Sequence, residues 1–158
     1  MVTVAEVRDA LSQVTDPEIP VLTIEDLGIL RDVRLEGSTI TVTITPTYSG
    51  CPAMDEIRAD VTSALAAHGW QDVVVEQVLS PAWTTDWMSD EGRRKLQEYG
   101  IAPPRRTRGV VDLVLGGLRC PQCGSTNTEE LSRFGSTSCK GMWRCKDCRE
   151  PFDHFKDH

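Results

Sequence analysis

The sequence predicts an α+β protein, with two or three helices on a three-stranded sheet followed by an antiparallel β ribbon. Within the first 80 residues, stretches of helical and of strand periodicity alternate. The last 48 residues instead carry two Cys-x-x-Cys pairs separated by a segment long enough for a hairpin. Between these regions, the run Gly-Ile-Ala-Pro-Pro-Arg-Arg at residues 100–106 breaks regular structure. We therefore expect a domain over residues 1–100, a linker over 101–110 and a ribbon over 111–158.

The first domain begins with a predicted helix over residues 3–14, where apolar residues recur every three or four positions. Thr3 and Glu6 occupy the two positions of a capping box, a reciprocal pair of hydrogen bonds that starts a helix. The helix is expected to end before Asp16-Pro17-Glu18-Ile19-Pro20, because each proline removes a backbone donor and restricts the residue before it.

Two strands, residues 27–35 and 39–45, are predicted to form a hairpin with one buried face. A helix is then expected from Cys51-Pro52 to Gly69, because its apolar residues return every three or four positions. Residues 73–79 have the composition of a third strand. After an aromatic loop, a short helix from Ser89 to about Tyr99 completes this region.

Composition and charge limit the classes of function. The formal net charge is -7, and residues 1–110 carry 17 Asp or Glu against 10 Lys or Arg, while residues 111–158 carry seven of each. Because phosphate binding needs a cationic surface, nonspecific nucleic-acid binding is disfavoured. No run of about 18 uncharged apolar residues and no basic leader is present, so we expect a cytoplasmic protein without membrane contact.

Four cysteines form the most specific motif of the chain. Cys120 and Cys123 make one Cys-x-x-Cys knuckle, and Cys145 and Cys148 make a second after 21 intervening residues. This spacing is typical of a zinc site, because each tight turn aims two sulfurs at one ion. Zinc is the expected metal, with a rubredoxin-like iron as competitor and unrelated thiol pairs as the non-metal alternative. A closed four-thiolate site leaves no position for substrate water, so the ion is expected to be structural.

Cys139 is surplus to this set. The sequence leaves two roles open for it, an apolar filler of the ribbon or an additional ligand to iron or a cluster. His154 and His158 lie close to the chain terminus, which is expected to fray, and they are predicted to be bystanders.

Cys51 is the only cysteine in the first domain and precedes a predicted helix. A helix N-terminus favours the thiolate, the form that attacks or binds a soft metal, although a buried inert thiol is the alternative. Asp16 and Glu18 supply two carboxylates on a stiff loop that could face this sulfur, or they are ordinary turn and solvent residues. A thiol hydrolase is not expected, because His68 lies at the far end of the same helix.

Three motifs resemble the signature of SufT-like iron–sulfur cluster assembly domains over residues 1–80: Asp16-Pro17-Glu18-Ile19-Pro20, Asp26-Leu27-Gly28 and Thr47-Tyr-Ser-Gly50-Cys51-Pro52. The remainder resembles the PaaD family of subunits encoded with phenylacetyl-CoA epoxidase. That part of the likeness rests on the two knuckles and on strings such as Phe134-Gly-Ser-Thr-Ser-Cys-Lys140 and Glu150-Pro-Phe152. The resemblance then spans nearly the whole chain.

The resemblance implies an accessory protein, not an enzyme, that matures iron–sulfur or iron cofactors of the multicomponent epoxidase in aerobic phenylacetate degradation. It implies that Cys51 is a transient iron or cluster ligand, with Asp16 and Glu18 beside it. The implied partner is the epoxidase reductase with its [2Fe–2S] cluster. Because one thiolate is too few for a cluster, a homodimer, a partner cysteine or an added thiol would complete the site.

Two other functions stay open at this point. One is a noncatalytic adaptor that stabilises the oxygenase assembly, with Trp83 and Trp87 as interface anchors. The other is a zinc-ribbon nucleic-acid binder, which the acidic charge balance disfavours.

Overall fold

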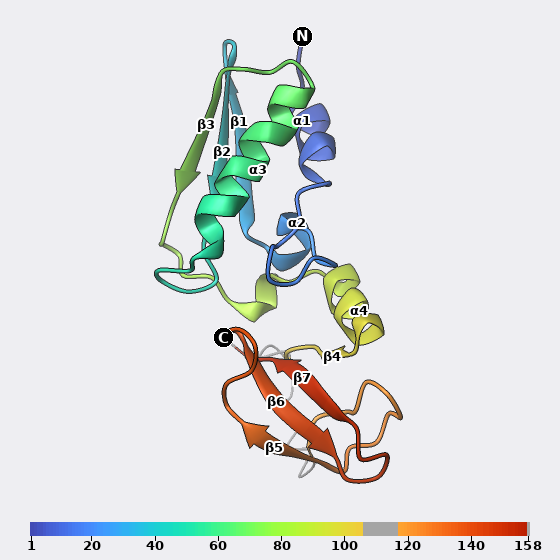
Figure 1. Ribbon diagram of the computed structural model, residues 1–158. Helices are drawn as coiled ribbons and strands as arrows, with labels where there is room; N and C mark the ends of the chain where they lie inside the picture. Colours follow the sequence, from blue (N-terminus) through green and yellow to red (C-terminus); the bar gives the residue numbers. More distant parts are fainter. Residues whose placement is uncertain (106–116, 158) are drawn as a thin grey trace. The chain divides into compact units, whose positions relative to one another are not determined.

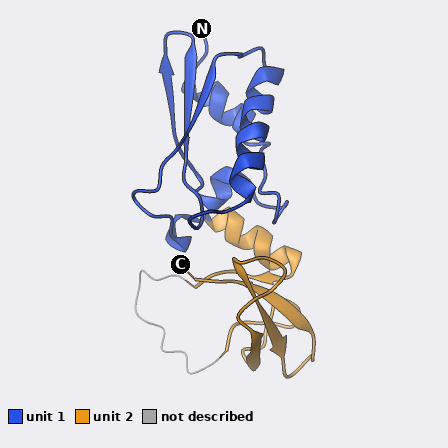
Figure 2. Cartoon of the chain, turned by 60° about the vertical axis from the view of Figure 1, so that its left-hand side comes forward, with its two compact units in different colours: residues 1–89 blue, residues 90–158 orange. Residues whose placement is uncertain are grey.

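The computed structural model describes residues 1–105 and 117–157, and the chain divides into two compact units, residues 1–89 and residues 90–158 (Figure 2). This division differs from the expected boundary after residue 100, because a helix and a strand that follow Ser89 belong to the second unit. Residues 101–102 of the expected linker form that strand, while residues 106–110 lie outside the described residues. No helix in the described part of the chain is long and apolar enough to span a membrane.

The first unit is a three-stranded sheet with two helices on one face (Figure 1). Its main elements are α1 (Val4–Leu11), β1 (Leu30–Glu36), β2 (Thr39–Ile44), α3 (Ala53–Ala67) and β3 (Val73–Gln77). β1 and β2 form the predicted hairpin, and β3 is the predicted third strand. β3 runs parallel to β2, and a parallel pair needs a crossover connection, which α3 provides.

Local sequence accounts for these elements. The capping box at the start of α1 is complete, since the Thr3 side chain accepts from the N–H of Glu6 and the Glu6 carboxylate accepts from the N–H of Thr3. Apolar residues at helical spacing place one face of α3 in the core. The buried residues of α3 are Ala53, Met54, Ile57, Val61 and Leu65. In β2, Ile40, Val42 and Ile44 are at most 1% exposed, and they complete the same core.

A short helix, α2 (Ile24–Leu27), interrupts the region in which the sequence predicted the start of a strand. Its N-cap Thr23 forms a second capping box with Asp26, and it ends at Gly28, where φ is +78°. A β-carbon at position 28 would lie 2.7 Å from the Cβ of Trp87, so only glycine fits between α2 and the 3-10 turn η1 (Thr85–Trp87). The predicted first strand therefore begins three residues late, at Leu30.

Ser89, the last residue of the first unit, is hydrogen-bonded to Asp26 of α2. The Asp26 carboxylate accepts from the N–H of Thr23 at 3.2 Å and from the hydroxyl of Ser89 at 3.1 Å. The N–H of Ser89 donates in turn to the carbonyl oxygen of Asp26 at 2.8 Å. Asp26 is therefore both the second member of the capping box of α2 and the anchor of the chain exit.

The second unit contains α4 (Asp90–Tyr99) and a four-stranded sheet of β4 (Ile101–Ala102), β5 (Thr128–Ser132), β6 (Lys140–Cys145) and β7 (Pro151–Phe155). The strand order is β4-β7-β6-β5. The pairs β5–β6 and β6–β7 form the predicted antiparallel ribbon, while β4 is parallel to β7. His154 lies on β7 and is 5% exposed, so the expectation that it lies in a frayed terminus is wrong; His158 lies outside the described residues.

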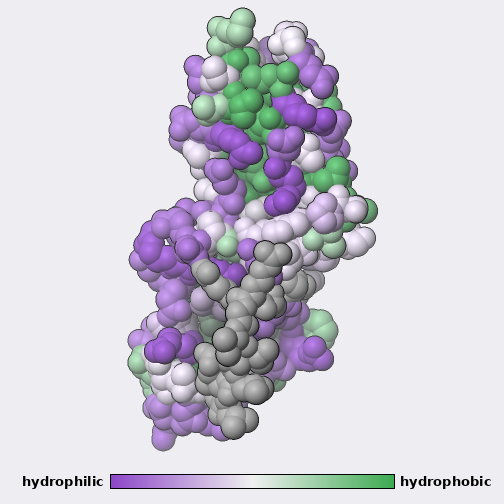
Figure 3. Space-filling model, turned by 180° about the vertical axis from the view of Figure 1, so that it is seen from behind, coloured by the Kyte–Doolittle hydropathy of each residue, from purple (hydrophilic) through white to green (hydrophobic). Residues whose placement is uncertain are grey.

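The buried hydrophobic residues described in the second unit include Leu96, Ile101, Cys139 and Phe155. One hydrophobic cluster of this unit consists of Ala102, Leu118, Cys120, Cys145 and Phe152, with Trp143 packed against it. Two of its members are cysteines of the predicted metal site. In the view of Figure 3, apolar side chains lie at the surface of the first unit, whereas the coloured surface of the second unit is mostly hydrophilic.

Candidate functional site

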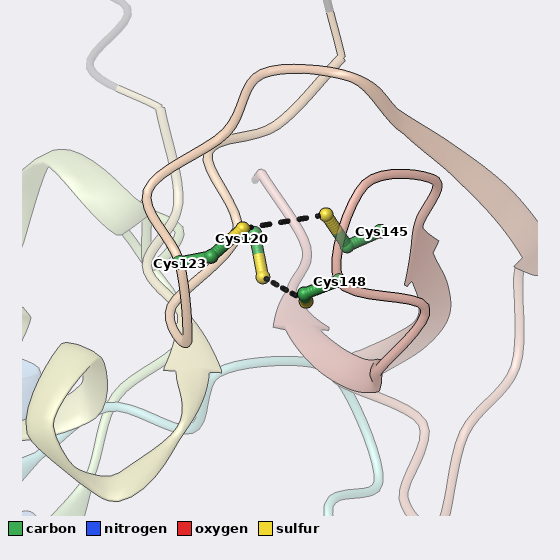
Figure 4. Close-up of side chains that lie close together, drawn as sticks. All are labelled: Cys120, Cys123, Cys145 and Cys148. Atoms are coloured by element: carbon green, nitrogen blue, oxygen red, sulfur yellow. Dashed lines mark hydrogen bonds between the residues drawn. The ribbon is translucent and has the colours of Figure 1, made fainter.

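The four predicted metal cysteines lie together in the second unit (Figure 4). Their sulfur atoms all lie within 4.8 Å of one another. The Sγ atoms of Cys120 and Cys148 are 3.7 Å apart, and those of Cys123 and Cys145 are 3.6 Å apart. Cys120 and Cys145 are buried, whereas Cys123 and Cys148 reach the surface.

Backbone hydrogen bonds shape the two knuckles. In the first knuckle, the N–H of Gly124 donates to the carbonyl of Cys120 at 2.9 Å, and the N–H of Cys120 donates to the carbonyl of Ser125 at 2.8 Å. In the second, the N–H of Cys145 donates to the carbonyl of Glu150 at 3.0 Å. The hairpin of β5 and β6 brings the second knuckle back to the first, as the spacing predicted.

The sulfur positions fit a tetrahedral ion. A metal–sulfur bond of about 2.3 Å in tetrahedral geometry places neighbouring sulfurs about 3.8 Å apart. The two close sulfur pairs are within about 0.2 Å of that edge. Thiolate ligands suit zinc and iron alike, so this geometry supports a closed metal site without choosing between the two ions.

The pKa values of Cys145 and Cys148 are shifted in opposite directions. Hydrogen bonds from the backbone N–H of Cys148 and of Asp147 lower the pKa of Cys145 to about 7. The N–H of Glu150 acts in the same direction on Cys148, but burial and the neighbouring sulfurs outweigh it and raise the pKa of Cys148 to about 12. Four thiolates therefore need a cation to coexist here, which is the usual situation in a thiolate metal site.

Cys139 lies outside this group. It is 5% exposed, its Sγ is 3.1 Å from the Thr137 hydroxyl, and its carbonyl accepts from the N–H of Lys156 at 2.9 Å. The surroundings are those of a buried packing residue. The structure does not bring Cys139 to the other four cysteines.

Cys51 lies in the loop between β2 and α3 and is half-buried. Its N–H donates to the carbonyl of Tyr48 at 3.2 Å, and its own carbonyl accepts from the N–H of Met54 at 3.3 Å. The pKa of Cys51 is shifted upward, opposite to the direction that the helix N-terminus alone would give. Burial raises the pKa of Cys51 and outweighs the hydrogen bonds from the Ala53 N–H and the Tyr48 and Thr47 hydroxyls, which act to lower it.

The two carboxylates of the Asp16-Pro17-Glu18 loop have different roles: Asp16 fixes the loop, and the charge of Glu18 affects Cys51. Asp16 is 7% exposed, and its Oδ1 accepts from the N–H of Glu18 at 2.8 Å and from that of Ile19 at 2.9 Å. This is an Asx turn that fixes the loop. The Glu18 charge is close enough to contribute to the raised pKa of Cys51, as a loop facing the sulfur would.

The two predicted interface tryptophans differ. Trp83 is 6% exposed, and its Nε1–H donates to the carbonyl of Leu27 at 2.8 Å. This environment does not fit the expected role as an interface anchor, because the ring is part of the core. Trp87 is half-buried, and the guanidinium of Arg31 stacks 3.6 Å from its ring centroid.

Sequence reasoning missed the hydroxyls that surround Cys51. Thr47 and Tyr48 both hydrogen-bond its sulfur. The signal was present, since the run Thr47-Tyr48-Ser49 directly precedes Gly50-Cys51, but periodicity and spacing say nothing about which hydroxyls turn toward a thiol.

Comparisons with known proteins agree with both parts of this picture. Residues 4–77 match the family described as iron–sulfur cluster assembly protein, and residues 111–156 match the PaaD zinc beta ribbon domain. A protein of Escherichia coli (strain K12), which its name describes as a subunit of a "Putative 1,2-phenylacetyl-CoA epoxidase", is 48% identical over 153 residues. These residues are 97% of this chain and 92% of the relative.

Two further relatives cover the first unit. An Fe-S protein maturation auxiliary factor of Porphyromonas gingivalis is 39% identical over 89 residues, 54% of this chain and 83% of that protein. The crystal structure of a domain of unknown function from Bacillus anthracis matches with a TM-score of 0.55 and 28% identity, over 58% of this chain and 89% of that one.

Fold, cysteine site and family matches together define a two-part protein, an iron–sulfur cluster assembly domain followed by a zinc ribbon. The resemblance inferred from the sequence is thereby confirmed. The chain belongs to the PaaD family.

Proposed function

We propose that the protein is a maturation factor that delivers iron or an iron–sulfur cluster to a component of the phenylacetyl-CoA epoxidase system, with Cys51 as the transient ligand. The observation that carries the proposal is the place of Cys51. It is a half-buried thiol on the cluster-assembly domain, at the start of α3, with two hydroxyls and the charge of Glu18 around it. The relatives support a non-catalytic role, because they are named as maturation auxiliary factors.

The raised pKa of Cys51 fits a cargo site that is loaded only when metal is present. A protonated thiol is a poor ligand and a poor nucleophile, so the free protein is protected from side reactions at neutral pH. The negative charge of Glu18 opposes the bare thiolate, but it favours a cation bound at the same sulfur. Metal binding at Cys51 would thus release a proton and strengthen as pH rises.

One thiolate is an incomplete ligand set for a cluster. The proposal therefore includes a second ligand source, either Cys51 of a second copy in a homodimer or a cysteine of the partner. The proposed client is the epoxidase reductase, which holds a [2Fe–2S] cluster, and the proposed location is the cytoplasm. The resident ion of the four-cysteine site is proposed to be structural zinc, in agreement with the family of the ribbon.

The test is co-production of the epoxidase subunits with wild-type protein, Cys51→Ala or Cys139→Ala. Each subunit is then purified and analysed for iron, sulfide and turnover. Cys51→Ala should be folded and zinc-loaded yet leave the reductase deficient in cluster, while Cys139→Ala, the matched cysteine control, should support full loading. Full loading with Cys51→Ala would refute transfer at this residue. Reduced subunit assembly with complete cofactors would favour the adaptor function.

A further inference from the structure

The two knuckles of the ribbon differ at one backbone position. The residue after the second cysteine of each knuckle has a left-handed conformation, with φ of +77° at Gly124 and +66° at Arg149. Glycine adopts this conformation without strain, whereas a side chain makes it unfavourable by about 1 kcal/mol or more. Arg149 is the one non-glycine residue with positive φ in the described part of the chain.

The strain at Arg149 calls for a compensating role of its side chain. The first knuckle shows that glycine builds this turn, so the fold itself does not require arginine. Residues held in such conformations concentrate at binding and catalytic sites. Arg149 is exposed, so burial of its side chain in a core does not compensate for the strain.

Arg149 borders a recess of about 380 Å³ at the second knuckle. The described residues that line it are Arg144, Cys145, Lys146 and Arg149. Three of these four are cationic, and the fourth is a member of the metal site. A hollow lined by two guanidinium groups and one ammonium group has the chemistry of a carboxylate or phosphate site.

Two of the cations are held in position from the neighbouring strand. Glu129 on β5 pairs with Arg144 on β6, and its other oxygen lies 3.6 Å from the Lys146 ammonium. The N–H of Lys146 also donates to the carbonyl of Asn127 at 2.8 Å. The side chains of Arg144 and Lys146 stay 50% exposed, so each can still donate to a ligand. Among the described residues that line the recess, three side chains are cationic and none is a carboxylate, so its lining offers hydrogen-bond donors to an anionic ligand.

We propose that this recess binds an acidic segment of a partner protein, in which two or three neighbouring carboxylates meet Arg144, Lys146 and Arg149. The inference is independent of whether Cys51 carries iron. Guanidinium groups bind carboxylates through paired hydrogen bonds, which gives such a site direction as well as charge. It gives the ribbon a docking function in addition to metal binding.

Charge favours an acidic peptide over nucleic acid. Residues 1–89 carry 14 Asp or Glu against four Lys or Arg, whereas residues 90–158 carry 10 against 13. A long polyanion that extends beyond the recess meets Asp147 and Glu150 in the same knuckle. A short acidic segment needs only the recess.

The experiment measures binding of fluorescein-labelled hexaglutamate to the zinc-loaded full chain by fluorescence anisotropy at low and at physiological salt. A hexaglutamine peptide and a 12-nucleotide oligo-dT serve as probes of peptide charge and of nucleic acid. Arg149→Gly and Lys146→Gln should each raise the Kd for hexaglutamate about fivefold or more. The control Arg133→Gln removes an exposed arginine of the ribbon that does not line the recess, and it should leave the Kd unchanged.

Arg149→Gly makes the test sharp, because its two expected effects have opposite signs. Glycine relieves the strained turn, so zinc retention against a chromogenic chelator should stay the same or improve while peptide binding is lost. Four results would overturn the proposal. They are no binding by the wild type, equal or tighter binding of oligo-dT, an equal loss with Arg133→Gln, and faster zinc release from Arg149→Gly, which would make the arginine a shield of the metal site.

Discussion

The two units of this chain are stabilised in different ways. The first unit buries most of the aliphatic core, including large side chains with no exposed surface such as Leu11, Ile24 and Leu65. The described residues of the second unit include fewer buried aliphatic side chains, and in one of its clusters two of five members are metal-site cysteines. Area buried by aliphatic residues can hold the first unit together without help. The second unit buries less aliphatic area, so we expect its stability to depend on the bound ion.

Metal removal should separate the two units most clearly. Chelation by EDTA, or Cys120→Ser, should unfold the ribbon and leave the first unit folded, because thiolate coordination contributes on the order of 10 kcal/mol to such a site. Hydrogen exchange followed by mass spectrometry should show loss of protection in β6 and β7 and normal protection in β2. Cys139→Ser is the matched control and should keep both patterns. Loss of protection in β2 along with β6 would show that the units do not fold independently.

A cavity in the core of the first unit should destabilise that unit and leave the ribbon unaffected. Ile57 on α3 has no exposed surface, so Ile57→Ala should lower the free energy of unfolding of the first unit by about 2–5 kcal/mol. The zinc content and the exchange pattern of β6 should not change. Urea titration with far-ultraviolet circular dichroism measures the free energy of unfolding, and metal analysis measures the zinc content. Zinc loss in this variant would contradict the independence of the ribbon.

A pH change should act on the second unit through His154. Burial lowers the pKa of this imidazole from 6.5 to about 4, so the folded unit holds it neutral. Between pH 6.5 and pH 4 the unfolded chain binds the proton more tightly, and the stability present above pH 6.5 is lost as pH falls through this window. The expected loss from pH 7 to pH 5 is about 2 kcal/mol.

The measurement for His154 is urea unfolding at both pH values with excess zinc, followed by exchange of β6 and β7 peptides. His154→Gln removes the titrating group and should flatten the difference between the two pH values. An unchanged pH dependence in that variant would assign the effect to protons that compete with zinc at the cysteines.

The smallest effect concerns Cys51. Wild-type Cys51 should react with iodoacetamide more slowly than a free thiol at pH 7.5, because burial raises its pKa. Glu18→Gln removes a charge that opposes the thiolate and should raise the rate about two- to threefold. The control Glu25→Gln removes a carboxylate that pairs with Arg8 and should not change it. Peptide mass spectrometry measures the alkylation rate at Cys51. An unchanged rate in Glu18→Gln would show that Glu18 does not act on the thiol.

Features coded over short distances were predictable. The capping box at Thr3 and Glu6, the apolar stripe of α3 and the two knuckles each depend on residues within a few positions of one another. Local rules state how such residues interact, and the structure agrees with them.

Features set by tertiary packing were not predictable. The helix N-terminus at Cys51 favours a thiolate locally, but the burial that reverses the pKa comes from the folded domain. Trp83 has the composition of an interface anchor, yet its indole closes on the carbonyl of Leu27, 56 residues away. Likewise, His154 is near the end of the chain but is held on β7 by pairing with Gly141.

The hydrogen bonds between Asp26 and Ser89 have a mechanical consequence. Ser89 is the last residue of the first unit, and its hydroxyl and N–H are both bound to Asp26, whose carboxylate also accepts from the N–H of the N-cap residue Thr23. A pull on the chain beyond residue 89 is therefore taken up first by one carboxylate and one carbonyl at the start of α2. The hydrogen bonds of Asp26 thus help to protect the domain that carries Cys51 from tension in the chain that follows Ser89.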